Sequence, residues 1–392
     1  MTAVGTTLRT PRLARAAVAV TFAANGFLFG AWVPRIPEIK HDLDLSSGAL
    51  GLALLAPALG SVLTVGLYGR ACLRFGSAPV TRAVLVAFCA LAWLAGIAPN
   101  LGWLFLVLFG WGATIGGLDV AMNAQGVTVE QAYGRPVLSG FHAAWSLGSL
   151  TGAMVGGLGA GLDVPIAGQQ AVLGLLLVVG VLVVDRAFLA DPAQRVTARP
   201  RRATPELRLV LIGVAGLCAL LSEGAVADWS GVLLRENLHV SAGQVGLAYA
   251  AFSVAMTAGR LVGDRVVFAL GRQRSIAVLT AIGAAGVAAG LATGTLAGAV
   301  IGFTLLGIGL SIMVPVLFST AADGANAGPA IATVSAIGYT GFLVGPSAIG
   351  LIAQGTSVPF ALWLLPLVTC AGGLLGIVAV RITAGRKPAG DG

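Results

Sequence analysis

Charged residues are scarce in this sequence. Asp, Glu, Lys and Arg make up only 10% of its 392 residues, and 57% are hydrophobic, whereas soluble proteins usually contain about 25% charged residues. A surface with so little charge is insoluble in water, but it suits a chain that lipid covers. The composition therefore excludes an ordinary soluble domain and predicts an integral membrane protein.

Residues that bind metals or form disulfides are also few. The four cysteines and three histidines are scattered, with no Cys-x-x-Cys pair and no metal-ligand spacing. Nucleophile motifs and glycine-rich phosphate loops are missing from the sequence as well. We therefore expect no cofactor, no metal site and no enzymatic activity, and we expect a gradient rather than ATP as the energy source.

Long apolar runs fill most of the chain. Twelve of them approach the roughly 17–25 residues that cross a bilayer as a helix, which predicts an all-α fold of twelve transmembrane helices. The first run follows Arg9, Arg12 and Arg15 and continues through Phe27, so we predict an uncleaved span rather than a signal peptide. The predicted spans are 16–36, 49–69, 80–98, 102–124, 138–160, 166–184, 207–230, 244–264, 275–294, 297–319, 330–353 and 359–380.

The basic residues predict the orientation of these spans, because Lys and Arg collect in cytoplasmic loops. With the N-terminus inside, only Arg35, Lys40 and Arg235 of the 23 basic residues lie on the outer side. This bias predicts both termini in the cytoplasm and an inner (plasma) membrane location. The formal charge of +8 is then a topology signal, and no nucleic-acid partner is expected, since that would need a basic patch on one folded domain.

A segment rich in Arg, Pro and Ala interrupts the apolar runs after the sixth span. We interpret it as a cytoplasmic strap without a fold of its own. The predicted organisation is a six-helix bundle over 1–184, the linker over 185–206, a second six-helix bundle over 207–380 and a cytoplasmic tail over 381–392.

The two halves resemble each other. Two six-helix repeats in parallel orientation are a recurring plan in transporters, and their substrate site lies near the midplane between the repeats. The matches are 46–52 (SSGALGL) with 241–247 (SAGQVGL), Arg70 with Arg265 and Gly76 with Gly271 at a shift of 195 residues, and Asn25-Gly26 with Glu223-Gly224 at a slightly larger shift.

One motif between the eighth and ninth spans carries a family resemblance. The run 259–265 (GRLVGDR), followed by Gly271-Arg272, resembles the cytoplasmic loop signature of the major facilitator superfamily, in which an acid and an arginine brace neighbouring helix ends. The first half has Gly69 where that acid would be, which weakens the case for a matching salt bridge there.

Further motifs are similar to those of the MosC-like branch of that superfamily, a neighbour of the fucose-permease group. The resemblance implies a gradient-driven transporter, and the branch's link to an inositol-derived compound suggests sugar- or polyol-like cargo. The fifth span lacks the Gly-Pro motif of many antiporters, which disfavours drug efflux. The motifs are 119–125 (DVAMNAQ), 140–148 (GFHAAWSLG), 223–230 (EGAVADWS) and 338–346 (GYTGFLVGP).

Acids inside the predicted spans are candidates for proton coupling, because ionisable side chains are costly in a bilayer. Glu223 lies within the seventh span, with no basic residue close to it in sequence. Asp119 and Asn123 are four residues apart and share a helix face, where they either bind a polar solute and relay a proton or are simply hydrated. Asn25 corresponds to Glu223 in the repeat, and it either binds solute hydroxyls or bonds across helices.

Two spans combine a polar face with a stripe of glycines. We predict that the polar faces line a substrate cavity and that the stripes pack against other helices. Alternatively, a single histidine such as His142 has only a structural role. The candidate substrate residues on these faces are His142, Trp145 and Ser146 in the fifth span and Tyr339 in the eleventh, and the stripes are Gly148, Gly152 and Gly156, and Gly338, Gly341 and Gly345.

The ends of the spans hold candidate gating residues. On the outer side, Asp228 either pairs with Arg35 or Arg235 or is merely solvated. On the inner side, the candidates are Arg70, Asp264 and Arg265.

The sequence as a whole predicts a secondary active transporter that carries a small polar solute by alternating access, with proton-coupled symport as the favoured mode. The alternative within transport is a proton-driven exporter of a small metabolite or drug. A sensor is disfavoured because the linker and tail are too short for a signalling domain. The expected partners are a small-molecule substrate, protons and the lipid bilayer, and the chain is expected to act as a monomer.

Overall fold

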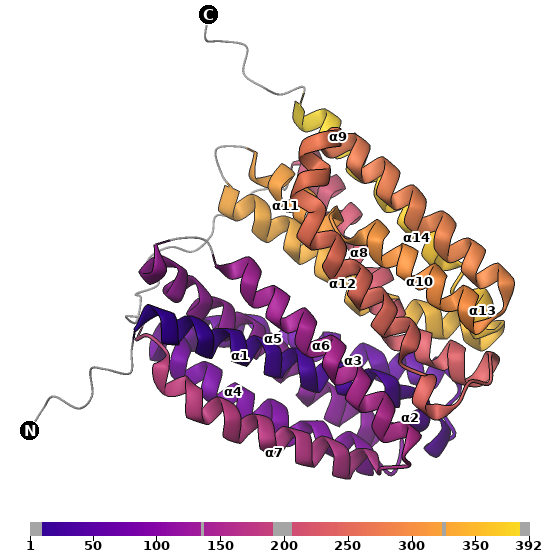
Figure 1. Cartoon of the computed structure of the whole chain (residues 1–392), viewed down its shortest axis with the longest axis horizontal. Coiled ribbons are helices and arrows are strands. Elements are labelled where there is room, and N and C mark those ends of the chain that lie inside the picture. The colour runs from indigo at the N-terminus through magenta and orange to yellow at the C-terminus, as the bar shows by residue number, and fades with distance from the viewer. Residues whose placement is uncertain (1–9, 135–136, 191–205, 324–326, 385–392) are drawn as a thin grey trace, which may run out of the picture. The chain divides into compact units, whose positions relative to one another are not determined.

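The structure is a computed structural model that describes residues 10–134, 137–190, 206–323 and 327–384. Within these ranges the regular elements are helices and there is no strand, so the predicted all-α fold is confirmed (Figure 1). The helices are α1 Pro11–Trp32, α2 Ile36–Asp42, α3 Ser47–Phe75, α4 Ser77–Ala92, α5 Leu101–Tyr133, α6 Leu138–Gly161, α7 Ile166–Val184, α8 Leu207–Val232, α9 Leu247–Thr293, α10 Leu296–Leu310, α11 Met313–Ala322, α12 Ala327–Gly355, α13 Val358–Ala361 and α14 Leu364–Ala384.

Ten helical segments of the described chain are long and apolar enough to cross a membrane. One of them contains α9, which covers two predicted spans and has a non-helical residue, Gly271, between its arms. The 24-residue helix α6 covers the predicted fifth span but is less apolar, because it is rich in Gly and Ser. Counting both arms of α9 and adding α6 accounts for the twelve predicted spans.

The backbone supports the internal repeat. Gly76 between α3 and α4 has φ 85° and ψ 157°, and Gly271 within α9 has φ 76° and ψ 157°. Asp44 and His239, which are also 195 residues apart, both have positive φ, at 48° and 52°. The predicted alignment therefore pairs residues that have the same rare backbone conformation in both halves.

Replacing Gly271 with alanine is expected to destabilise the protein. Its φ and ψ lie in a region that is essentially restricted to glycine, where strain costs about 1–3 kcal/mol. A Cβ at this position would meet no atom within 4 Å, so the backbone alone would cause the loss. The midpoint of thermal unfolding in detergent should fall for Gly271→Ala but not for Gly66→Ala, a helical position that is equally open. Equal midpoints for the two variants would contradict this prediction.

Glycines bring α1 and α6 into backbone contact. A Cβ on Gly148, Gly152 or Gly156 of α6 would overlap a backbone carbonyl of α1, and a Cβ on Gly26 or Gly30 of α1 would overlap a carbonyl of α6. Close backbone approach through small residues is a common packing mode in membranes. The prediction that this stripe is a packing surface is confirmed.

The second half repeats this arrangement with α8 and α12. A Cβ on Gly341 would overlap the carbonyl oxygen of Leu217, and a Cβ on Gly345 would lie 3.1 Å from that of Leu221. The eleventh-span stripe is thus also a packing surface. In both halves, the polar residues of α6 and α12 lie on helices whose position is fixed by glycine contacts.

The described chain divides into two compact units. The first contains α1, α2, most of α3 and α4–α7, and the second contains α8–α14. Part of the repeated segment (46–52 and 241–247) is assigned to the opposite unit in each half. Ser46–Gly51 belongs to the second unit and Ala242–Gly246 to the first. In the second unit the Gly48 N–H donates to Gln354 Oε1 at 3.0 Å, and in the first unit Gly246 lies against Pro34.

Candidate functional site

Asp119 and Asn123 form a polar pair on α5. The Asn123 side-chain amide donates to the backbone oxygen of Asp119 at 2.8 Å and to its Oδ1 at 3.0 Å. Asp119 is exposed and Asn123 is half-buried, so the pair lies on the accessible side of the helix. The predicted shared face is therefore present, and it presents a carboxylate with one amide partner inside an apolar helix.

Glu223 of α8 has a basic neighbour that its own sequence region does not reveal. Arg260 Nη2 of α9 lies 3.7 Å from Glu223 Oε2, and both side chains are partly exposed. Arg260 was not among the predicted site residues. The signal available in the sequence was its position inside the motif 259–265. We interpreted that motif only as a loop signature and not as part of the site around Glu223.

Asn25 of α1 contacts Trp145 of α6. The Trp145 indole N–H donates to Asn25 Oδ1 at 2.6 Å. Asn25 is only 4% exposed, and its Nδ2 has no hydrogen-bond partner among the described residues. Asn25 thus fixes the indole and retains unused donors, so the structure brings two predicted substrate residues together.

An aromatic cluster that the sequence analysis missed adjoins this pair through Phe29. The ring of Phe29 lies 5.9 Å from Trp145 and 6.4 Å from Trp111, which stacks on Phe88 at 5.4 Å between ring centroids. Phe29 follows Asn25 by four residues and so shares its helix face, which was the available signal. The cluster gives the first unit an apolar wall beside the Asn25–Trp145 pair.

The remaining predicted substrate residues lie in different surroundings. His142 packs edge-on against Phe22 with ring centroids 5.3 Å apart. The Ser146 hydroxyl donates to the backbone oxygen of His142 at 3.1 Å. Tyr339 of α12, in the second unit, is exposed. Their roles in binding stay predictions.

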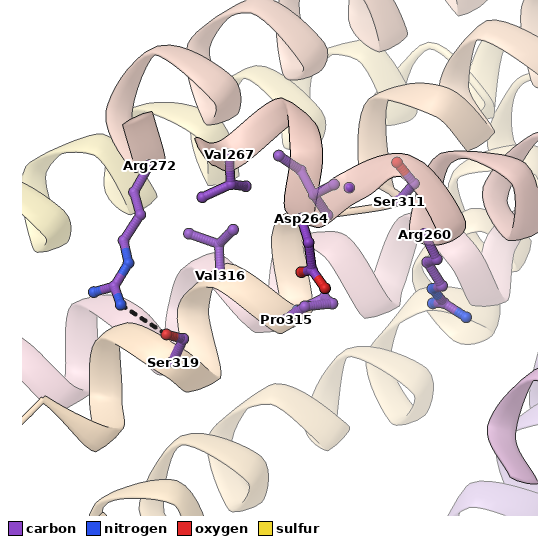
Figure 2. Close-up of a pocket in the computed structure, with 10 residues that line it drawn as sticks. Arg260, Asp264, Val267, Arg272, Ser311, Pro315, Val316 and Ser319 are labelled. Atoms are coloured by element: carbon purple, nitrogen blue, oxygen red, sulfur yellow. Dashed lines mark hydrogen bonds between the residues drawn. The ribbon is translucent and has the colours of Figure 1, made fainter. Parts of the chain in front are cut away.

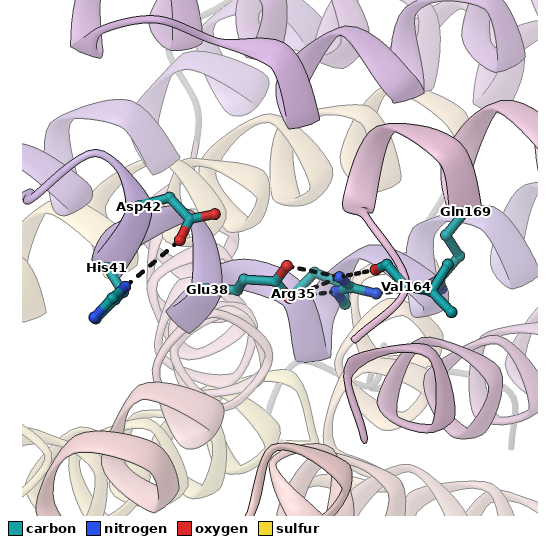
Figure 3. Close-up of polar contacts among 6 residues, drawn as sticks. All are labelled: Arg35, Glu38, His41, Asp42, Val164 and Gln169. Carbon is teal, nitrogen blue, oxygen red and sulfur yellow. Dashed lines mark hydrogen bonds and ion pairs between the residues drawn. The ribbon is translucent and has the colours of Figure 1, made fainter. Parts of the chain in front are cut away.

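Arg35, a predicted gating residue, is completely buried just after the C-terminal end of α1 (Figure 3). Its guanidinium donates twice to the Glu38 carboxylate at 2.8 Å, to the Val164 backbone oxygen at 2.6 Å and to Gln169 Oε1. These partners connect the end of α1 to the α6–α7 loop and to α7. Arg35 therefore has a full set of partners within the first unit.

The other outer gating candidates differ in their contacts. Arg235 donates to the Val240 backbone oxygen at 2.9 Å, while Asp228 is half-buried on α8 and has no hydrogen bond or ion pair to another described residue. The pairing predicted for Asp228 stays untested.

The motif on α9 lies at a small cavity of about 170 Å³ in the second unit (Figure 2). Asp264 lines this cavity. Asp264, Arg265 and the repeat counterpart Arg70 on α3 are all exposed. The helix brace in this region is made by Arg272, which forms an ion pair with Asp323 and donates to Ser319 Oγ at 2.8 Å. Arg272 therefore ties α9 to the end of α11.

Comparison with known proteins defines the class. The chain is 34% identical over 346 residues to an MFS-type transporter of Yersinia pestis, covering 87% of this chain and 89% of that protein. It is 32% identical over 358 residues to the membrane protein MosC of Rhizobium meliloti, covering 90% and 86% of the two chains. No family model matches the sequence. The fold and these relatives together define a membrane transporter and not an enzyme.

Solved structures show the same fold. A bacterial homologue of the human lysosomal transporter Spinster, in an inward-facing and unoccupied conformation, matches with a TM-score of 0.76 at 12% identity and covers 97% of this chain and 99% of its own. The D323A mutant of the nucleoside transporter NupG matches with a TM-score of 0.70 at 12% identity and covers 95% of this chain and 99% of its own. A second NupG structure, also 12% identical, covers 95% of this chain and 100% of its own. The chain belongs to the major facilitator superfamily, as its motifs predicted.

Proposed function

We propose that this transporter moves a small polar solute, sugar- or polyol-like in character, together with protons by alternating access between its two units. The observation that carries the proposal is the presence of accessible carboxylates on two apolar helices, Asp119 on α5 and Glu223 on α8. Charges at such positions are expensive and usually functional. We place the protein in the inner (plasma) membrane with both termini cytoplasmic and acting as a monomer.

The two acids have partners that suit a protonation cycle. Asn123 donates to Asp119, and Arg260 lies near Glu223, so each carboxylate has one polar partner beside it. Neutralising an acid by a proton releases that group for the solute or for another side chain. Solute binding and proton binding are then linked through the same contacts.

The polar and aromatic groups of the first unit support a ringed, hydroxylated cargo. Trp145 is held in place by Asn25 and is flanked by Phe29, and a fixed indole provides a stacking surface for a sugar-like ring. Asn123 and Ser146 add polar groups on α5 and α6.

Substituting the acids is expected to uncouple the transporter. In proteoliposomes, Glu223→Gln and Asp119→Asn should lose proton-driven accumulation of the transported solute but retain solute-for-solute counterflow, because exchange requires no net proton movement. Myo-inositol and D-glucose serve as probes, with a pH-sensitive dye trapped inside the vesicles. The matched control is Asp163→Asn, an exposed loop acid whose positive φ of 52° asparagine tolerates.

The outcomes separate the alternatives. Accumulation that is unchanged in both acid variants contradicts proton coupling at these residues. Proton movement opposite to the solute identifies the proton-driven exporter instead of the symporter.

A further inference from the structure

The first residues of the predicted linker are folded against the first unit. A short 3-10 helix, Asp185–Ala187, follows α7 directly, and Phe188 continues in an extended conformation with φ −57° and ψ 137°. The side chains of Asp185 and Phe188 are both buried, although they belong to the predicted linker. We call residues 185–190 the clasp.

A glutamine of α5 holds the backbone of the clasp. Gln125 is completely buried, and its amide bonds to both backbone groups of Leu189. Nε2 donates to the Leu189 oxygen at 3.0 Å, and the Leu189 N–H donates to Oε1 at 3.1 Å. Nε2 also donates to Ser77 Oγ at the start of α4, at 2.9 Å. One side chain therefore satisfies the backbone of the clasp and joins it to two helices.

The remaining contacts of the clasp are few. Asp185 forms an ion pair with Arg82 of α4, whose side chain is 45% exposed. Phe188 is the one large apolar side chain of the clasp that is buried, since Leu189 is half-buried and Ala190 is exposed. Segments with few buried apolar contacts open locally more readily than helices of a packed core. The clasp therefore depends on a small number of directional bonds.

The clasp changes the helix to which the linker is attached. In the chain the linker continues α7, but the bonds of Gln125 attach it to α5. Gln125 is the last residue of the motif 119–125, and the same motif supplies the polar pair of Asp119 and Asn123. One motif thus contains a candidate coupling pair and the residue that holds the linker.

We propose that the clasp is a latch of the first unit, with Gln125 as its positioning residue, and that it opens without unfolding of α4, α5 or α7. When the latch is closed, the linker is attached to α5. When it is open, the linker is attached through α7 alone, and each freed residue adds up to about 3.3–3.6 Å to its reach. The latch therefore sets the length of the tether between the two units, whichever solute and coupling ion the transporter uses.

Hydrogen–deuterium exchange of the full chain in detergent tests the latch. Gln125→Met keeps an unbranched side chain of similar length but removes the amide. Exchange in a peptide that covers 185–190 should become about tenfold faster, because local opening no longer breaks the bonds to Leu189. Peptides from α4 and α7 should keep their rates.

The matched control is Gln170→Met on α7. Gln170 is also a buried glutamine of the first unit, but neither atom of its amide has a hydrogen-bond partner among the described residues. This variant should leave exchange of the clasp unchanged, which separates loss of the Gln125 bonds from loss of any buried glutamine.

Trypsin provides a second measurement. The Arg186 side chain is exposed, so the closed clasp protects the peptide bond after Arg186 through its docked backbone. Cleavage at this bond should be about tenfold faster in Gln125→Met than in wild type. Cleavage after Arg70, an exposed arginine within α3, should not change, whereas a general loss of stability would accelerate both.

Leu189→Pro tests the latch from the side of the clasp. Proline removes the N–H that donates to Gln125, and the ψ of 137° at Phe188 is typical of a residue before proline. This substitution lies outside the helices, so it decides the matter if Gln125→Met does not fold. Unchanged exchange of the clasp in either folded variant overturns the proposal. Equal acceleration in the clasp, α4 and α7 also overturns it, because the clasp would then open only with the helices.

Discussion

Replacing Gly152 with leucine is expected to prevent correct assembly of the first unit. A Cβ at this position would overlap the carbonyl oxygen of Phe27 and lie 3.0 Å from the Ala31 nitrogen. Both are backbone atoms, so relief requires α1 and α6 to move apart along their whole contact. Overpacking of this kind typically costs about 1–3 kcal/mol, and a leucine between two backbones should exceed that range. Since folded proteins are stable by only about 5–15 kcal/mol, we expect little folded protein.

The measurement is the yield of monodisperse protein by size-exclusion chromatography, followed by thermal unfolding of whatever is recovered. Gly180→Leu is the matched control, because Gly180 lies on the exposed side of α7 and a Cβ there meets no atom within 4 Å. This variant should fold at least as well as wild type, since leucine is the better helix former. Normal yield and stability of Gly152→Leu would show that α1 and α6 do not depend on this contact.

Replacing Arg35 with alanine is expected to produce the second large loss of stability. The substitution leaves Gln169 Oε1 and the Val164 carbonyl without their donor and removes the partner of Glu38. Removing one member of a buried charged network costs about 3–5 kcal/mol, because the remaining polar groups stay buried without partners. The midpoint of thermal unfolding in detergent should fall steeply.

Arg235→Ala is the control for Arg35, because it removes an exposed arginine that donates one hydrogen bond, to the Val240 backbone oxygen. It should cost about 0.5–1.5 kcal/mol, the contribution of one ordinary hydrogen bond. Arg35→Lys should lose nearly as much stability as Arg35→Ala, since one ammonium cannot reach three diverging acceptors. Similar midpoints for the Arg35 and Arg235 variants would contradict a structural role for the buried network.

The sequence by itself determined the class and the repeating plan of the protein. Apolar runs predicted the spans, because a bilayer requires each crossing segment to satisfy its own backbone and to present apolar side chains. Glycine spacing predicted the packing stripes on α6 and α12, and the 195-residue shift placed Gly76 on Gly271. These features are local, so they can be identified from the sequence alone.

Only the tertiary structure decided which polar groups meet. The approach of Arg260 to Glu223, the three partners of Arg35 and the Asn25–Trp145 hydrogen bond join residues on different helices. The helix ends on either side of Gly76 and of Gly271 were likewise not evident from hydropathy. Hydropathy specifies how deep a residue lies in the membrane. Which side chains that residue meets depends on the rotation and packing of separate helices, and the glycine contacts between the helices fix that packing.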